Sequence, residues 1–327
     1  MSQKPILMIP GDGENGPAFI EKAAELMGLL VPDIQFTRAD FGRTSWEYTN
    51  EVLPPETEDA IAEADHVLCG QADVKDLQKN DPVDTIIRYN NLFLRAVEYI
   101  PLGRLCPKGI DACIVSSVQR VTRQCNELDS LDGIESTIDT VSEDESRFYT
   151  ACADLARTRG RTSMTLAVNR DVFPHASKMS DNIYEESLKG TGYTKRVLTL
   201  TEAASNLAQN PTEAGMIVGD PIVASALRGE AAGLSGGMGI MPETLIGEGL
   251  RMYIPPMHMP AERADNPTSV YLAASNLLLD LGYIDACMNL RAAIQEAYRN
   301  RIITRDVGGK KTHEEFTSAI VEALNSM

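Results

Sequence analysis

The stretch KPILMIPGDGENGPAFIEKAAELMGLL, residues 4–30, decides the fold class of this chain. A short apolar run ends in a glycine-rich turn, and the residues after the turn have the apolar spacing of a helix. The alternation continues with a strand, a helix and a third strand in residues 33–42, 53–64 and 66–72. Strands that alternate with helices predict an α/β fold with a mostly parallel sheet.

Later segments continue this alternation. Two apolar runs, DACIVSSV (111–118) and TSMTLAV (162–168), predict strands, and residues 216–233 predict a strand, a loop and a helix. The segment 126–146 is interpreted as an acidic, turn-rich excursion. Helical spacing predicts further helices in 145–159, 199–210, 269–282, Ile284 to about Arg301, and from His313 onwards.

Composition and charge exclude some classes of function. The 327 residues are 43% hydrophobic and 24% charged, as in an ordinary soluble globular protein, and predict two domains or one large α/β domain. With 30 Lys and Arg against 47 Asp and Glu, the formal net charge is −17. That charge argues against binding to nucleic acid or to an anionic membrane, and it is otherwise typical of a highly soluble surface or of life at elevated salt.

Cysteines, histidines and the first residues bear on location. The six cysteines show no C-x-x-C pair and the four histidines no local zinc pattern, which favours reduced, buried thiols in a cytosolic chain. The start, MSQKPILMIPGDG, lacks the apolar region of a signal peptide, and no apolar run approaches the roughly 18 residues of a membrane span. We expect a cytoplasmic protein that does not bind membranes.

Four segments, in this order, carry a resemblance to a known family: IPGDGENGP (9–17), LSGGMGIMPETLIGEG (234–249), YIPPMHMPAERADNPTSVYLAASNLLLDLGY (253–283) and TRDVGGKKTHEEFTSAIVEAL (304–324). The chain resembles the β-decarboxylating dehydrogenases, which include isopropylmalate, isocitrate and homoisocitrate dehydrogenases. Their pattern reads I-P-G-D-G-I-G-P, then G-S-L-G-L-L-P, then a loop that ends in N-P, and finally D-L-G-G. The resemblance spans nearly the whole chain.

The resemblance implies an isopropylmalate dehydrogenase-like fold of two α/β domains, the first of them discontinuous. Residues 1–98 with 245–327 would form the cofactor-side domain, and 99–244 would form the second domain, which lines the cleft and supplies dimer contacts. This fold is not a Rossmann fold, in agreement with the absence of G-x-G-x-x-G after the first strand. Members are dimers or larger, so we expect a homodimer whose neighbouring subunit completes the cleft.

The family chemistry oxidises a 2-hydroxy acid by hydride transfer to NAD or NADP and then releases CO2. A divalent cation held by aspartates chelates the hydroxyl and carboxylate groups. Counted without gaps, the ligand positions fall on Thr201, Ser225 and Gly229, which are poor or impossible ligands for a hard cation. Asp220 would substitute if the alignment carries a local gap, or it begins a turn before Pro221. The resemblance therefore implies a site that has lost its usual metal.

The acid–base pair of the family is a lysine and a tyrosine. Arg170 stands at or beside the lysine position, and an arginine binds an anion but does not act as an ordinary acid or base. We assign Arg170 the catalytic position on this ground. No tyrosine precedes the helix that begins near Glu145, and Tyr149 within it is interpreted as packing rather than catalysis.

Arginines clamp the substrate carboxylates in the family, and Arg88 and Arg95 are the candidates here. They are seven residues apart, so they share a face if the segment is helical; they either bind an anion or form surface ion pairs. The third arginine is missing, since Ser116 stands in its place and the next arginine is Arg120.

On the cofactor side, Asn266-Pro267 matches the N-P of the family and Asp306 begins the D-V-G-G that matches D-L-G-G. His258 corresponds to a histidine that contacts adenine. Glu262 stands near the acidic residue that binds a ribose 2′-hydroxyl of NAD, whereas Arg263 beside it would suit the 2′-phosphate of NADP. The choice between NAD and NADP stays open.

Two hypotheses follow. The first is an NAD(P)-linked oxidoreductase that acts on a small anionic hydroxy acid without the usual metal chemistry. The alternative is a non-catalytic paralogue, a regulatory or ligand-binding subunit that keeps the fold. The metal ligands, the base and one arginine have changed together while Asn266 and Asp306 remain, which favours a repurposed active site.

Overall fold

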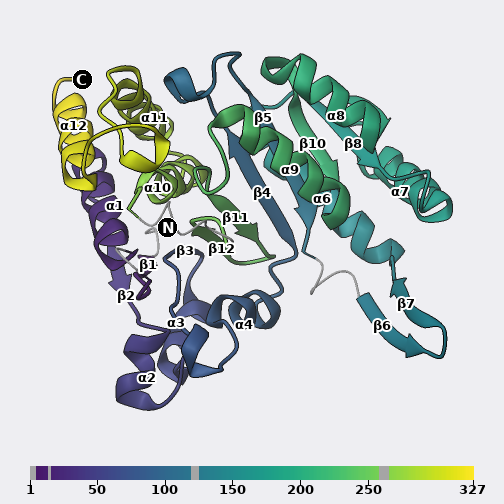
Figure 1. The fold of residues 1–327 in the computed structure, drawn as a ribbon, viewed down its shortest axis with the longest axis horizontal. Coiled ribbons are helices and arrows are strands. Elements are labelled where there is room, and N and C mark those ends of the chain that lie inside the picture. Colours follow the sequence, from purple (N-terminus) through teal and green to yellow (C-terminus); the bar gives the residue numbers. More distant parts are fainter. Residues whose placement is uncertain (1–4, 14–15, 119–124, 258–264) are drawn as a thin grey trace.

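The computed structural model describes residues 5–13, 16–118, 125–257 and 265–327. Helices pack around a large twisted sheet (Figure 1). Its ten strands lie in the order β2 (Phe36–Arg38), β1 (Ile6–Ile9), β3 (His66–Cys69), β12 (Arg251–Ile254), β11 (Glu243–Ile246), β4 (Leu94–Tyr99), β5 (Ala112–Ser117), β10 (Gly215–Gly219), β8 (Ser163–Val168) and β9 (Thr194–Thr199). Three neighbouring pairs, β12–β11, β11–β4 and β4–β5, are antiparallel, and six are parallel. The predicted α/β fold with a mostly parallel sheet is confirmed.

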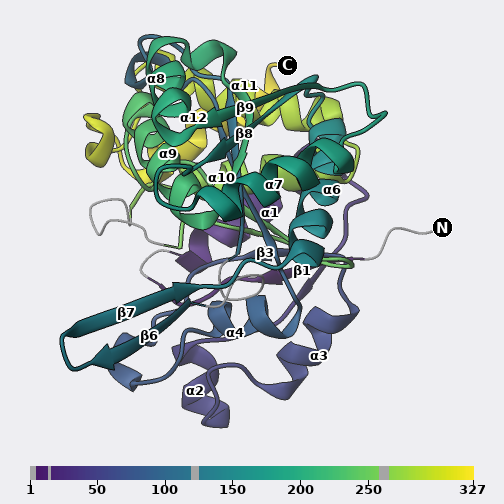
Figure 2. The same ribbon diagram turned by 90° about the vertical axis from the view of Figure 1, so that its right-hand side faces the viewer.

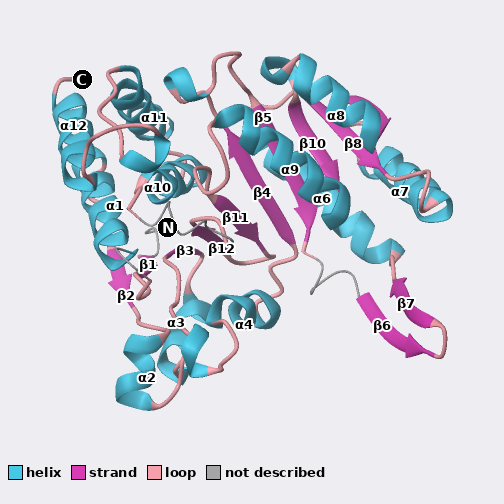
Figure 3. Ribbon diagram, in the orientation of Figure 1, coloured by secondary structure: helices cyan, strands magenta, loops and turns pink. Residues whose placement is uncertain are grey.

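Helices cover both faces of the sheet (Figure 3), because successive strand residues point to opposite sides. Along β5, Cys113 and Val115 pack with α6 (Ser142–Thr158) and α7 (Pro174–Ser187), whereas Ile114 packs in the same cluster as α9 (Pro221–Ser235). The remaining helices of the described residues are α1 (Gly16–Leu30), α2 (Arg43–Thr49), α3 (Pro55–Glu63), α4 (Pro82–Tyr89), α8 (Leu200–Gln209), α10 (Thr268–Asp280), α11 (Ile284–Arg299) and α12 (His313–Asn325).

Several elements differ from the sequence prediction. The segment interpreted as a turn-rich excursion holds an antiparallel hairpin, β6 (Cys125–Ser130) and β7 (Gly133–Ile138), which projects from the body of the molecule (Figure 2). Helix α7 and strand β9 were not predicted. Both lie in polar stretches without the apolar run that marks the other elements.

The two predicted domains share this one sheet. Strands β1–β3, β11 and β12 occupy one half of it, and β5, β8, β9 and β10 the other, with β4 between the halves. The division into residues 1–98 with 245–327 and residues 99–244 stays a prediction, because the sheet runs through the boundary without a break.

A buried ion network joins the two halves on the face away from α9. Arg159, after α6, contacts Glu98 of β4 and Asp280 of α10, and the side chains of Arg159 and Asp280 are 2% and 0% exposed. Arg251 Nη1 lies 2.9 Å from Asp280 Oδ1, and Arg291 Nη2 of α11 lies 3.2 Å from Glu98 Oε2. Charges this deeply buried are tolerated only when they are paired, so the network fixes α6 against α10.

Among the described residues, no helix is both long and apolar enough to cross a membrane.

Candidate active site

The candidate site lies at one edge of the sheet. The parallel strands β5, β10 and β8 end there, and Ser116, Asp220 and Arg170 stand at or just beyond their carboxyl ends. Arg95 joins them because antiparallel β4 begins at this edge, where Arg95 pairs with Ser116. The carboxyl ends of parallel strands are the usual place for ligands in α/β folds.

Two guanidinium groups meet beside this edge. Arg228 Nη1 of α9 donates to Ser116 Oγ at 3.0 Å. Arg95 Nε lies 3.1 Å from Glu243 Oε2, and its Nη2 lies 2.8 Å from Met257 Sδ. Removal from water, followed by the positive charge of Arg95, lowers the pKa of Arg228. Sequence reasoning missed Arg228, although it falls four and eight residues after Ala224 and Asp220, on one face of the helix.

The segment that holds Arg88 and Arg95 is not one helix, so the shared face does not form. Helix α4 ends at Tyr89, Asn91 is left-handed with φ 48°, and Arg95 belongs to β4. Arg88 is exposed, and its Nε donates to the carbonyl of Asp84 at 3.4 Å. The substrate roles predicted for the two arginines stay predictions.

Asp220 is the N-cap of α9. Its Oδ1 accepts from the backbone N–H of Ile222 at 2.8 Å and of Val223 at 3.0 Å, and Pro221 occupies the first helical position. This is the arrangement preferred at helix starts, and it engages one of the two carboxylate oxygens of Asp220.

The residues at the expected metal positions do not fit a divalent cation. Thr201, Ser225 and Gly229 lie exposed on α8 and α9 and bring no carboxylate. No group of three or more His, Cys, Asp or Glu side chains in the described part of the chain is placed to hold a metal ion. Hard cations need several oxygen ligands, and these three positions do not supply them.

Arg170 follows β8 and is paired with an acid. Its Nη2 lies 2.7 Å from Asp181 Oδ2 of α7, and its side chain is 46% exposed. Glu202, in the first turn of α8, lies near enough for Arg170 to help lower the pKa of that carboxyl, after hydrogen bonds from Thr199. Arg170 thus lies among acidic groups, and its catalytic assignment stays a prediction.

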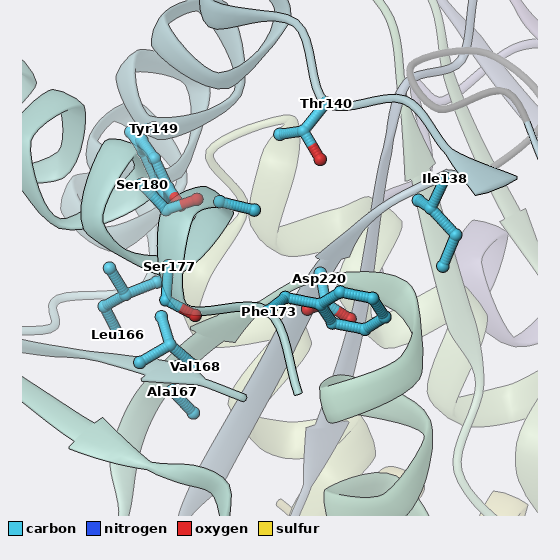
Figure 4. A pocket seen from close by; sticks show the side chains of 11 residues that line it. Ile138, Thr140, Tyr149, Leu166, Ala167, Val168, Phe173, Ser177, Ser180 and Asp220 are labelled. Atoms are coloured by element: carbon cyan, nitrogen blue, oxygen red, sulfur yellow. The ribbon is translucent and has the colours of Figure 1, made fainter. Parts of the chain in front are cut away.

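A small cavity of about 40 Å³ lies between the ends of β7 and β8, α7 and the start of α9 (Figure 4). Asp220 and Thr140 line it together with Tyr149. Tyr149 donates to Glu145 Oε2 at 2.7 Å, and Ser180 Oγ donates to the same oxygen at 2.9 Å. Burial, then the charge of Glu145, raises the pKa of Tyr149, which suits the packing role predicted for it.

The residues expected to hold the cofactor come from two loops that meet. Asn266, 5% exposed before α10, donates from Nδ2 to Asp306 Oδ2 at 2.8 Å, and its Oδ1 accepts from the Thr268 N–H at 3.0 Å. Gly309 is required for the turn after Asp306, because a Cβ there would lie 1.8 Å from the carbonyl oxygen of Ile303. His258, Glu262 and Arg263, like Arg120, lie outside the described residues.

The comparisons with known proteins match this architecture. A family model described as "Isocitrate/isopropylmalate dehydrogenase" matches residues 5–324. The chain belongs to this family. The resemblance on which its fold was predicted is therefore confirmed.

Individual relatives cover the whole chain at low identity. A 3-isopropylmalate dehydrogenase of Methanothermobacter thermautotrophicus is 26% identical over 339 residues, which cover 99% of both chains. An isocitrate/homoisocitrate dehydrogenase of Thermus thermophilus is 26% identical over 98% of this chain and 99% of its own. The crystal structure of a beta-decarboxylating dehydrogenase of Thermococcus kodakarensis superimposes with a TM-score of 0.88 at 23% identity, over 99% of this chain and 97% of that one, and shares its fold.

Proposed function

We propose that this protein is an NAD(P)-linked oxidoreductase that acts on a small anionic hydroxy acid, in a site without the usual metal ligands. The observation that carries the proposal is the contact between Asn266 and Asp306. The loops assigned to the nucleotide by resemblance are held together, whereas the positions of the metal ligands carry Thr201, Ser225 and Gly229.

The nucleotide would lie against the loops that Asn266 and Asp306 fix, with His258 and Glu262 as further contacts. When bound, NAD or NADP would accept the hydride from the carbon that bears the substrate hydroxyl, and the hydroxyl proton would pass to solvent water. Arg170 would hold an anionic group of the acid near the reacting centre, and it would keep its own proton, since a guanidinium stays charged at ordinary pH. Arg88 and Arg95 would bind carboxylates.

We further propose a cytoplasmic homodimer in which residues 99–244 supply the contacts. The hairpin β6–β7 supports this, because it projects from the molecule (Figure 2) with Leu128, Leu131 and Ile134 62%, 105% and 68% exposed. Large apolar side chains on a projecting element commonly mark a contact surface.

The alternative is a non-catalytic paralogue that serves as a regulatory or ligand-binding subunit. The pairing of Arg170 with Asp181 favours it, because a cation already held by a carboxylate is less available to a substrate. Such a protein would bind a nucleotide or a small acid without turnover.

A metal-dependence experiment tests the proposed chemistry. We expect Mn²⁺ or Mg²⁺, added with isopropylmalate or isocitrate, to leave the melting temperature unchanged and to produce no NADH. A screen of small 2-hydroxy acids with NAD+ and NADP+ should then find one that is oxidised without added metal. A metal-dependent rise in melting temperature, or oxidation of either standard acid, contradicts the account of the metal site.

A further inference from the structure

Among the described residues, the guanidinium of Arg228 has no ion-pair partner. Its one hydrogen bond among the described residues joins Nη1 to Ser116 Oγ, a neutral acceptor, and no described carboxylate forms an ion pair with it. The residue is half-buried on the face of α9 that packs on β5. A cation held partly out of water is unfavourable unless an opposite charge is close.

Arg95 adds a second positive charge beside it. Arg95 forms an ion pair with Glu243, with Nε 3.1 Å from Oε2. The same carboxylate attracts the charge of Arg228 but forms no hydrogen bond with it. The cluster of Arg95, Arg228 and Glu243 therefore holds two cations and one anion. Its net charge is +1, in a protein whose formal net charge is −17.

The cluster is partly exposed to solvent. The side chains of Arg95 and Glu243 are 21% and 12% exposed, and Arg228 is half-buried rather than enclosed. The two guanidiniums offer planar, forked donors that match the geometry of a carboxylate. The strand edge beside them is where ligands of α/β folds bind.

We infer that Arg228, together with Arg95, binds the carboxylate of the small acid on which the protein acts. One carboxylate group brings the cluster to neutrality, and its planar pair of oxygens matches the forked guanidinium donors, which a tetrahedral phosphate matches less well. Arg228 reaches Ser116 from α9, so its guanidinium lies at the carboxyl end of β5. This inference rests on the proposed function and names the residue that would select an anionic substrate.

The test compares four proteins: the wild type, Arg228→Met, Arg228→Lys and Arg147→Met. Arg147 is the matched control, a half-buried arginine on α6, against the opposite face of the sheet, that pairs with Asp144 and Glu248 at 3.5 and 3.7 Å. Calorimetric titration uses oxalate as the carboxylate probe, inorganic phosphate as the competing anion and NADH as the nucleotide, and melting temperatures are measured without ligand.

We expect oxalate to bind the wild type and Arg147→Met alike, and to bind Arg228→Met about tenfold or more weakly, as for a lost charge-assisted hydrogen bond. Arg228→Lys should bind with intermediate affinity, since it keeps the charge and loses the fork. Without ligand, Arg228→Met should melt no lower than the wild type, because it removes a half-buried cation that forms no ion pair with the described residues.

The outcomes separate this inference from the proposed function. Failure of oxalate to bind the wild type, equal oxalate binding in Arg228→Met, tighter binding of phosphate than oxalate, or a clear fall in the melting temperature of that variant overturns the inference. NADH binding is unchanged in every variant if the oxidoreductase proposal is correct. Absence of NADH binding with Arg228-dependent oxalate binding would instead reject the oxidoreductase and leave the anion site in place.

Discussion

Asp280 is the residue on which the buried network depends most. Its carboxylate is 0% exposed and contacts Arg159 and Arg251, and Tyr253 donates to its Oδ2 at 2.7 Å. We predict that Asp280→Ala lowers the free energy of unfolding by about 3–5 kcal/mol, because it leaves the Arg159 guanidinium buried with a single carboxylate. Urea unfolding measures the change, and a loss below about 1 kcal/mol would contradict the pairing.

The same network predicts a dependence of stability on pH. Burial alone would raise the pKa of Asp280 and of Glu98, yet the arginines around them hold both below the ordinary range. A carboxyl with a lowered pKa in the folded state stabilises the fold above its ordinary pKa, and this contribution disappears as the pH falls through the folded value. The melting temperature should therefore fall from about pH 5 downward.

Asp280→Asn and Glu98→Gln check the origin of that fall, since each keeps the shape of the side chain and removes one titrating group. Both variants should show a shallower loss of melting temperature between about pH 5 and about pH 3 than the wild type. Equal slopes in all three proteins would place the pH dependence elsewhere in the molecule.

At the scale of an element, Asp220 at the start of α9 either caps the helix or binds a metal, and substitutions of this residue distinguish the two roles. We predict that Asp220→Ala lowers the free energy of unfolding by about 1 kcal/mol, whereas Asp220→Asn leaves it nearly unchanged, because asparagine caps helices as well as aspartate does. A metal ligand would behave differently. If Mn²⁺ stabilises the wild type and fails to stabilise Asp220→Asn, Asp220 binds the metal in addition to capping α9.

Elements with a strong apolar pattern were predictable from the sequence, and elements defined by distant contacts were not. Strand β1 and helices α1, α10, α11 and α12 appear where their apolar patterns placed them. Strand β4 was missed because the spacing of Arg88 and Arg95 also fits one continuous helix. The left-handed backbone of Asn91 breaks such a helix, but the sequence around Asn91 does not reveal that conformation. Hairpin β6–β7 was missed because it has few apolar residues and no continuous apolar run.

The candidate site residues depend on the same distinction. Asn266 and Asp306 were singled out because each belongs to a short local motif; the structure brings them into contact, and their cofactor role stays a prediction. Arg228 was missed because its partner, Ser116, lies 112 residues away in the sequence. A contact of that kind depends on how α9 lies over β5, which no local pattern records.

For the whole molecule, we predict a dimer with about twice the 35.7 kDa mass of one chain. Charged substitutions of the exposed hairpin residues, Leu128→Asp with Ile134→Asp, should shift it towards the monomer, since they place charge on an apolar contact surface. Light scattering after gel filtration measures the mass. Met288→Asp on α11, which is 59% exposed, is the control, and a monomeric wild type would contradict the proposed assembly.

Calorimetric titration of the purified protein with NAD+, NADH, NADP+ and NADPH tests most directly whether the chain keeps a nucleotide site beside an altered substrate site. We predict saturable binding of one oxidised and reduced pair, without added metal. No binding of any of the four would contradict it, and the contact between Asn266 and Asp306 would then serve the fold alone.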